Sequence, residues 1–312
     1  MPAEHAPRAL RATESPLAQA VRRVLRPGGW ALAALAAPGW LAAAPQGGQV
    51  VAGDLTIAQP DRLATTITQA TQRGAIDWRS FSIAGDEYVE FVQPGRSAVT
   101  LNRVVGSDPS ALLGRLTANG QVFLVNPQGV YFGQDAVVDV AGLVATTFAI
   151  SNEDFLAGRY EFSRAAGTGG GTVVNDGSLT AEGGYVVLAG PDGVANGGLI
   201  EARLGTVLLA AGERLTLDLS GDGLVSFALD GDALGGVENS GTLLADGGRV
   251  FLAADVAAGL VTTAVNQEGL VRARTVEERD GVIYLGGAGA DVVVSGTLDA
   301  DAGEADADGG RV

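Results

Sequence analysis

From residue 175 onward the sequence repeats a short pattern, and this repetition limits the possible folds more than any other feature. Each copy starts at an Asn or Gly turn, continues as Leu-x-Ala, passes a glycine and ends in a run of Val and Leu. The glycine before the leucine marks the copies at Gly177, Gly198, Gly241, Gly269 and Gly296. The steps are 21, 43, 28 and 27 residues, and we interpret the step of 43 as two turns, with residues 215–231 in the middle.

A period of about 20 to 28 residues, with short strands and Gly or Asn corners, is typical of a β-solenoid. The predicted fold class is therefore all-β, with coils that bury their apolar faces only by stacking on one another. A propeller blade needs about 40 residues and a β-sandwich does not repeat its sequence, so these two alternatives fit less well. The positions predicted to point inward are Leu179, Val187, Leu199, Val207, Leu243, Val250 and Leu285.

Three absences remove most catalytic classes. The 312 residues include no cysteine, the 20 basic residues are all arginine, and the single histidine is His5. A Ser-His-Asp or Cys-His system therefore has no base beyond residue 5, and a zinc site has no Cys or His ligands. A phosphate-binding loop of the GxxxxGK[ST] type has no lysine. We predict no enzymatic activity, no cofactor and no metal.

The acidic balance of the chain argues against a nucleic-acid partner. The net charge is −16, and residues 45–312 carry 15 arginines against 34 acidic residues. Such a surface repels a phosphate backbone. The stretch GGAGADVVV (286–294) matches the calcium-binding nonapeptide, but such sites need consecutive copies and this one stands alone.

A β-helical carbohydrate-active enzyme is the alternative from another functional class, because parallel β-helices also cleave polysaccharides with pairs of carboxylates. The sequence has adjacent acids at Asp86 and Glu87 and at Glu277 and Glu278. Neighbours in a strand point to opposite faces, so neither pair can flank one glycosidic bond. The corners are short and consist mostly of Gly, Ala and Asp, which favours a non-enzymatic protein.

The first 48 residues have the features of a secretory signal peptide with an extended n-region. Arg22, Arg23 and Arg26 precede the apolar run at 30–44, which ends in alanines. This order of basic residues, short apolar segment and small residues predicts export, and 15 residues are too few to span a bilayer comfortably. We expect the exported chain to begin between about residues 43 and 49.

Residues 49–165 do not repeat and contain the most unusual motifs. WRSFSIAGDEYVEFVQP (78–94) is predicted to form strand, turn and strand, and it is followed by LNRVVG (101–106). In ANGQVFLVNPQGVYFG (118–133), two strand-like runs flank Asn126, Pro127, Gln128 and Gly129. Proline presets φ, glycine tolerates a positive φ, and the Asn side chain can bond the backbone two residues on, so this tetrapeptide is predicted to be a turn.

Taken together, these motifs resemble the secretion domain of the two-partner secretion family, the filamentous haemagglutinin-like exoproteins. The resemblance covers residues 49–165, with residues 166–312 as β-helical repeats that we expect to continue beyond residue 312. It implies a right-handed parallel β-helix with an N-terminal cap. It also implies export through the periplasm of a Gram-negative bacterium to the exterior or the cell surface. The implied partner is an outer-membrane β-barrel transporter with POTRA domains.

The family's NPNG motif falls on Asn126, Pro127, Gln128 and Gly129, with Gln in place of the second Asn. Its NPNL motif has no counterpart, and Asn102 and Arg103 of LNRVVG take that place. The resemblance assigns these six residues to transporter recognition or secretion. It implies an adhesin that binds host-cell or glycan receptors as the passenger, and the stem of a contact-dependent toxin is a further alternative.

Overall fold

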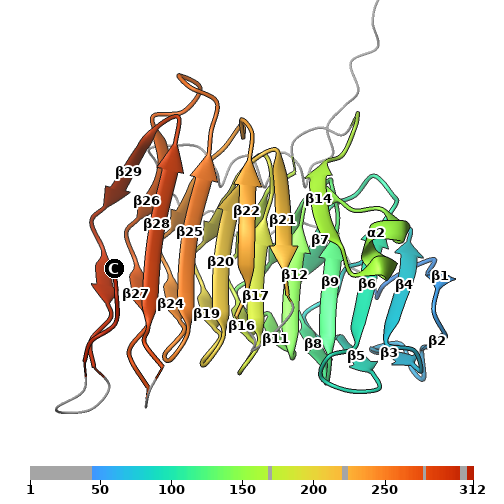
Figure 1. Cartoon of the computed structure of the whole chain (residues 1–312). Helices are drawn as coiled ribbons and strands as arrows, with labels where there is room; N and C mark the ends of the chain where they lie inside the picture. The colour runs from blue at the N-terminus through green and yellow to red at the C-terminus, as the bar shows by residue number, and fades with distance from the viewer. Residues whose placement is uncertain (1–43, 168–170, 220–223, 277–278, 303–307) are drawn as a thin grey trace, which may run out of the picture. The chain divides into compact units, whose positions relative to one another are not determined.

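The computed structural model describes residues 44–167, 171–219, 224–276, 279–302 and 308–312. The chain divides into two units, Met1–Pro38 and Gly39–Val312, and all described residues belong to the second. Within this unit the chain winds through three long sheets in turn, and successive windings lie side by side from the blue to the red end of Figure 1. The predicted all-β solenoid is confirmed as a parallel β-helix.

The strands of each long sheet follow one another in spatial order. The first sheet consists of β1 (Gln49–Ala52), β4 (Arg73–Trp78), β6 (Val99–Val104), β9 (Gln121–Val125), β12 (Gly142–Thr146), β17 (Tyr185–Ala189), β20 (Thr206–Ala211), β25 (Arg249–Asp255) and β28 (Val282–Ala288). The second consists of β2 (Leu55–Ala58), β3 (Ala64–Gln69), β5 (Tyr88–Val92), β8 (Arg115–Ala118), β11 (Val137–Asp139), β16 (Ser178–Thr180), β19 (Leu199–Glu201), β24 (Thr242–Leu244), β27 (Leu270–Arg272) and β30 (Thr297–Asp299). The third consists of β7 (Ser110–Leu112), β10 (Val130–Phe132), β15 (Val173–Asn175), β18 (Val194–Asn196), β23 (Val237–Asn239), β26 (Thr263–Gln267) and β29 (Asp291–Val294).

Strand pairing in the three long sheets is parallel, except at the N-terminal edge of two of them. There β1 pairs antiparallel with β4, and β2 pairs antiparallel with β3. These two strands cover the backbone groups that the first winding would otherwise leave unpaired, which is the function of a cap on a solenoid.

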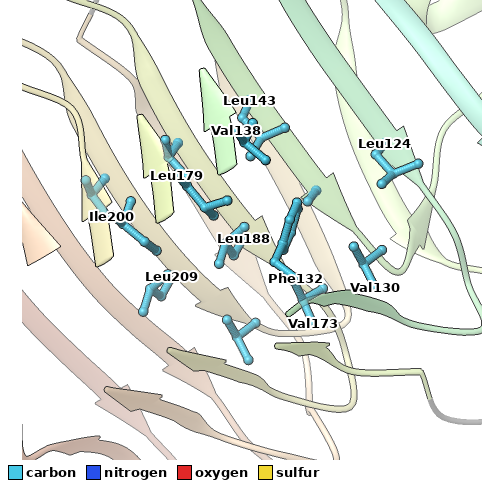
Figure 2. Close-up of a cluster of buried hydrophobic side chains, with 14 of the residues drawn as sticks. Leu124, Val130, Phe132, Val138, Leu143, Val173, Leu179, Leu188, Ile200 and Leu209 are labelled. Atoms are coloured by element: carbon cyan, nitrogen blue, oxygen red, sulfur yellow. The ribbon is translucent and has the colours of Figure 1, made fainter. Parts of the chain in front are cut away.

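One side chain from each winding of the second sheet points into the interior and stacks on the equivalent side chain of the next winding. The paired residues are Val138, Leu179, Ile200, Leu243, Val271 and Leu298. Figure 2 shows Val138, Leu179 and Ile200 in this row, with Leu188 and Leu209 of the first sheet nearby. Burial of one such side chain stabilises the fold by about 1.5–3 kcal/mol, so this ladder holds the windings together.

Two of the predicted inward positions were wrong. Leu199 is only partly buried and its neighbour Ile200 is the residue that points inward, because successive residues of a strand alternate in direction. Val187 is fully buried, but on the outer face of the first sheet rather than in the interior. Leu285 is partly buried and packs against the interior core, as predicted.

A separate antiparallel sheet lies over the outer face of the first sheet and creates a second core. This cover sheet consists of β13 (Phe148–Ala149), β14 (Tyr160–Arg164), β21 (Arg214–Asp218) and β22 (Ser226–Asp230). Leu215 and Leu217 of β21 are buried against outer-face residues such as Val187 and Leu208. The outer face of these windings is therefore apolar, and the runs of Val and Leu are buried on both sides.

The cover sheet also corrects our interpretation of the 43-residue step. Asn196 of β18 pairs directly with Asn239 of β23, so the step is one winding with an insertion rather than two windings. The inserted residues form β21 and β22, which pair antiparallel with each other. Their alternating polar and apolar residues suit a sheet with one buried and one exposed face, whereas a winding of the interior would not need that alternation.

The helix α2 (Asn152–Ala157) packs on the same outer face near the N-terminal windings. Ser151 caps it by accepting a hydrogen bond from the Asp154 amide, and Gly158 ends it with a φ of 76°. Its buried residue Phe155 lies edge-on to Phe123 of β9, with ring centroids 5.9 Å apart. The helix therefore extends the second core toward the N-terminal cap.

The predicted signal peptide falls, as far as residue 43, outside the described residues. Among the described residues, no helix is long and apolar enough to cross a membrane.

Candidate functional site

The Asn126–Gly129 segment forms the tight turn between β9 and β10 that the sequence predicts. The Gly129 amide donates to the Asn126 carbonyl at 3.0 Å, and the Gln128 amide donates to the Asn126 side-chain oxygen at 3.0 Å. Gly129 has a φ of 127°, which a residue with a Cβ rarely adopts. The expected bond from the Asn side chain to the backbone two residues on is therefore present.

The same Asn126 side chain also connects the turn to the previous winding. Its Nδ2 donates to the Asp108 carbonyl and to the Ser110 hydroxyl, both at 3.0 Å. The Asn126 backbone amide donates to the Thr146 carbonyl in the following winding at 2.9 Å. The side chain is 0% exposed, so one residue joins three consecutive windings from inside the protein.

The winding after the turn passes directly against it. A Cβ atom on Gly171 would lie 2.5 Å from the Pro127 carbonyl oxygen and from the Gly129 amide nitrogen. The backbone contact continues as the Val130 amide donates to the Thr172 carbonyl at 3.0 Å. Pro127 and Gln128 remain partly exposed, whereas Gly129 is buried. In the folded protein a partner can therefore reach only the middle of the motif.

Asn102 and Arg103 are adjacent in β6 but point to opposite faces of the first sheet. The Asn102 side-chain oxygen accepts a hydrogen bond from the Trp78 indole at 3.0 Å, and Asn102 is fully buried. This bond satisfies the one polar atom of the buried Trp78 side chain. Asn102 therefore has a structural environment inside the β-helix, where it pairs with Leu124, two residues before Asn126.

Arg103 connects the outer face of the first sheet to the start of α2. Its guanidinium donates to Asp77 at 3.2 Å, to the Ile150 carbonyl at 3.0 Å and to the Asn152 side chain at 2.6 Å. The Arg103 and Asp77 side chains are 21% and 26% exposed, so solvent screens their ion pair only in part. The structure thus does not bring Arg103 and Asn126 into one surface.

A row of buried amides in the third sheet was not identified from the sequence. Nδ2 of Asn175 donates to Asn196, that of Asn196 to Asn239, and that of Asn239 to Gln267, each at 2.7 Å. All four residues are almost fully buried. The sequence does contain a pattern that could have revealed this row, because each of the four residues lies two positions before a marker glycine, at Gly177, Gly198, Gly241 and Gly269.

Next to the turn, Tyr131 and Asp176 form a partly buried pair across two windings. The Tyr131 hydroxyl donates to the Asp176 carboxylate at 3.1 Å. Burial, together with the charge of Asp176, raises the pKa of Tyr131 to about 12. Burial also raises the pKa of Asp176 above its usual value, although the hydrogen bond from Tyr131 lowers it in part. Tyr131 therefore stays a hydrogen-bond donor at neutral pH.

The acid pairs considered for catalysis do not form a site in the part of the chain that the structure describes. The Glu87 carboxylate accepts from the backbone amides of Ala44 and Ala84, which gives it a structural function at a turn. Glu277 and Glu278 lie outside the described residues. No group of three His, Cys, Asp or Glu side chains that could hold a metal ion occurs among the described residues.

A β-helix with an apolar interior, a cover sheet and an Asn-Pro-Gln-Gly turn with a buried Asn126 is consistent with the resemblance noted in the sequence. A family model described as the TPS (two-partner secretion) secretion domain matches residues 42–300. The chain belongs to the TPS secretion domain family. The match includes the N-terminal motifs and most of the repeats.

Two relatives of the chain are named heme/hemopexin-binding protein and come from Haemophilus influenzae. One is 39% identical over 209 residues, which is 64% of this chain and 23% of the relative. The other is 33% identical over 264 residues, which is 77% of this chain and 28% of the relative. The chain therefore spans about a quarter of the length of these relatives.

A solved structure of the same kind supports the fold. The secretion domain of HMW1 from Haemophilus influenzae matches with a TM-score of 0.74 and 31% sequence identity, over 81% of this chain and 66% of that one. The chain is thus similar in sequence and in fold to the secretion domain of another exoprotein.

Proposed function

We propose that this TPS domain directs a non-enzymatic exoprotein to a cognate outer-membrane β-barrel transporter with periplasmic POTRA domains. Residues 1–48 would act as the signal peptide, residues 49–165 as the part that the transporter recognises, and residues 166–312 as the first passenger repeats. The exoprotein would leave a Gram-negative bacterium through the periplasm and stay at the cell surface or in the medium. Family membership over residues 42–300 supports this proposal.

The observation that carries the proposal furthest is the complete burial of the Asn126 side chain. A partner cannot contact a side chain with no exposed surface, so the Asn126 side chain is accessible only before its winding folds. The hydrogen bonds of the Asn126 side chain to Asp108, Ser110 and Gln128 all form during folding. We propose that the motif acts during the passage, by closing this winding as the unfolded chain emerges and thus making backward movement unfavourable.

The test compares secretion with stability in Asn126→Ala. The substitution removes three hydrogen bonds of one buried side chain, which should lower the free energy of unfolding by about 1–3 kcal/mol. Most domains of this size tolerate such a loss. In cells that co-express the transporter, we expect the secreted yield of Asn126→Ala to fall several-fold, while the purified variant still unfolds cooperatively.

Asn119→Ala is the matched control. Asn119 also lies at a corner, and its side chain makes two hydrogen bonds to the Gln93 backbone, at 2.7 and 2.8 Å. A secretion function specific to the motif predicts a smaller loss of yield for Asn119→Ala at a comparable loss of stability. Equal secreted yields of the two variants at equal stability would contradict a special function of Asn126.

For the passenger, the comparisons favour a ligand-binding exoprotein over an enzyme. The two relatives are named for binding of heme and hemopexin, which makes capture of haem or of a haem carrier a candidate beside the predicted adhesin. Both functions would place the receptor-binding residues on the passenger. Binding of purified protein to haemopexin, compared with binding to host-cell surfaces, would separate them. Turnover of polysaccharides that disappears on acid-to-amide substitution would contradict both candidates.

A further inference from the structure

The outer face of the second sheet is open to solvent over β5, β8 and β11, whereas the cover sheet and α2 lie over the first sheet. These three strands lie inside the second sheet, between β3 and β16, and every residue from 88 to 139 is described. Every second side chain of a strand points outward, and these side chains are exposed or partly exposed. We define the open face by six of them: Tyr88, Glu90, Arg115, Thr117, Val137 and Asp139.

Two rows of side chains run across the strands of the open face, along the axis of the β-helix. In the first row, Arg115 pairs with Tyr88 on one side and with Val137 on the other. In the second row, Thr117 pairs with a carboxylate residue in each neighbouring strand, Glu90 and Asp139. Tyr88 and Val137 are each 41% exposed. The open face therefore presents apolar surface beside hydrogen-bond donors and acceptors.

The second row continues beyond the open face with the same alternation. Asp139 pairs with Thr180, and Thr180 pairs with Glu201, so carboxylates and hydroxyls alternate over five strands. Neighbouring strands are about 4.8 Å apart, which places successive carboxylates of the row about 9.6 Å apart. Carboxylates that bind one metal ion have to lie much closer together, since each oxygen ligand is about 2–2.6 Å from the metal. The row therefore offers separate hydrogen-bonding positions at a regular spacing.

The charged groups of the open face do not bond to one another. Arg115 forms no ion pair with Glu90, Asp139 or any other acid among the described residues, whereas Arg164 and Arg272 pair with acids at 2.7–3.0 Å. These side chains therefore keep their donors and acceptors for a ligand. The two carboxylates, in a strongly acidic chain, disfavour a polyanion, and the arginine between them disfavours a polycation. A neutral ligand with many hydroxyl groups fits the open face best.

We infer that the open face binds a neutral, extended oligosaccharide that runs along the axis of the β-helix. One sugar ring would pack its C–H face on Tyr88, and hydroxyls of the chain would bond to Arg115, Thr117 and the two carboxylates. In a β-1,4-linked chain each ring is turned over relative to the one before, so equivalent hydroxyls recur every second sugar. This repeat suits carboxylates that recur every second winding. The site lies within residues 49–165, so it goes beyond the proposed transporter recognition and does not depend on it.

The test measures binding of oligosaccharides to the purified chain by calorimetry. Cellohexaose and chitohexaose are the neutral probes, and hexagalacturonate is the acidic comparison. We expect at least one neutral probe to bind more tightly than hexagalacturonate, with a dissociation constant that added salt changes little, because the ligand has no charge. Tyr88→Ala should raise this dissociation constant about threefold or more, since the sugar loses its apolar contact. The double variant Glu90→Gln/Asp139→Asn should also raise it about threefold or more.

Two control variants separate the open face from a general effect of charge or aromatic surface. Tyr284 of β28 is 51% exposed on the first sheet, and Glu161 of β14 is exposed on the cover sheet. Tyr284→Ala and Glu161→Gln should leave the dissociation constant within about twofold of the wild type. Absence of binding by both neutral probes, or an equal loss in the controls, would overturn the inference. Binding of a hexa-arginine peptide through Glu90 and Asp139, without binding of the neutral probes, would overturn the class of ligand.

Discussion

At the scale of a single residue, burial beside the Asn126–Gly129 turn raises the pKa of Asp176. Its carboxylate lies beside Tyr131, with no ion-pair partner among the described residues, and burial raises its pKa in the folded state. A carboxyl group with a raised folded-state pKa binds its proton more tightly in the folded chain than in the unfolded chain. Its contribution to stability is therefore fully present below the unfolded-state pKa and is lost as the pH rises through the folded-state pKa.

We predict that Asp176→Asn stabilises the protein at pH 7 and has little effect near pH 3. The amide carries no charge to desolvate and can still accept the hydrogen bond from Tyr131. Urea unfolding at the two pH values measures the difference, and the wild type should lose more stability between them than the variant does. A variant that is less stable than the wild type at pH 7 would show that the charged carboxylate is favourable in the fold.

The amide row of the third sheet acts at the scale of an element. The side chains of Asn175, Asn196 and Gln267 donate to the carbonyl of their own marker glycine. Three further bonds connect the four amides from Asn175 to Gln267 across successive windings. Because the amides are buried and have both donors and acceptors, they favour one register between windings. Apolar ladders alone specify the register less strictly, since a shifted register that pairs Val with Leu or Ile costs little stability.

Asn196→Leu tests this function of the row. The substitution removes the donor to Asn239 and the acceptor for Asn175, so buried polar atoms lose partners on both sides. We expect the free energy of unfolding to fall by about 2–4 kcal/mol, measured in urea. Asn266→Leu, in β26 of the same sheet, is the control, because its side chain bonds the exposed Glu268 and no amide of the row. A loss of similar size in the control would indicate that any Asn of this sheet matters equally.

At the scale of the whole β-helix, contacts run mainly between successive windings. Residues farther apart in the sequence meet where the cover sheet spans several windings, from β13 to β22, and in side-chain bonds such as that of the Tyr185 hydroxyl to Gln121. In such a structure a local defect should affect its neighbours and decay with distance along the axis. Stability is then a property of neighbouring windings rather than of one central core.

Ile200→Ala is predicted to show this decay. It removes one interior side chain from β19, which should destabilise the protein by about 2–5 kcal/mol. Hydrogen exchange should become faster mainly in β16 and β24, the strands that pair with β19. The strands β3 and β5 near the cap should keep their wild-type rates. A uniform increase over all described strands would mean that the β-helix unfolds as one cooperative unit.

The sequence alone determined the fold class, the turn at Asn126–Gly129 and the family. The first two follow from local information: glycine spacing, the alternation of strand residues and a tetrapeptide with restricted φ values. The family came from the resemblance of the motifs within residues 49–165 to the two-partner secretion domain. The same information placed Leu179, Val207, Leu243 and Val250 correctly in the interior. It could also have identified the amide row, since Asn or Gln recurs two positions before four of the five marker glycines.

Only the tertiary structure decided which face each buried strand residue occupies and where the insertion lies. Val187 and Val207 have the same residue type, but one lies in the second core and the other in the interior. A strand buried on both faces shows no alternation that would distinguish them. Likewise, nothing local indicates that β21 and β22 leave the β-helix and pair with each other. These contacts depend on how separate windings stack, which no short stretch of the chain encodes.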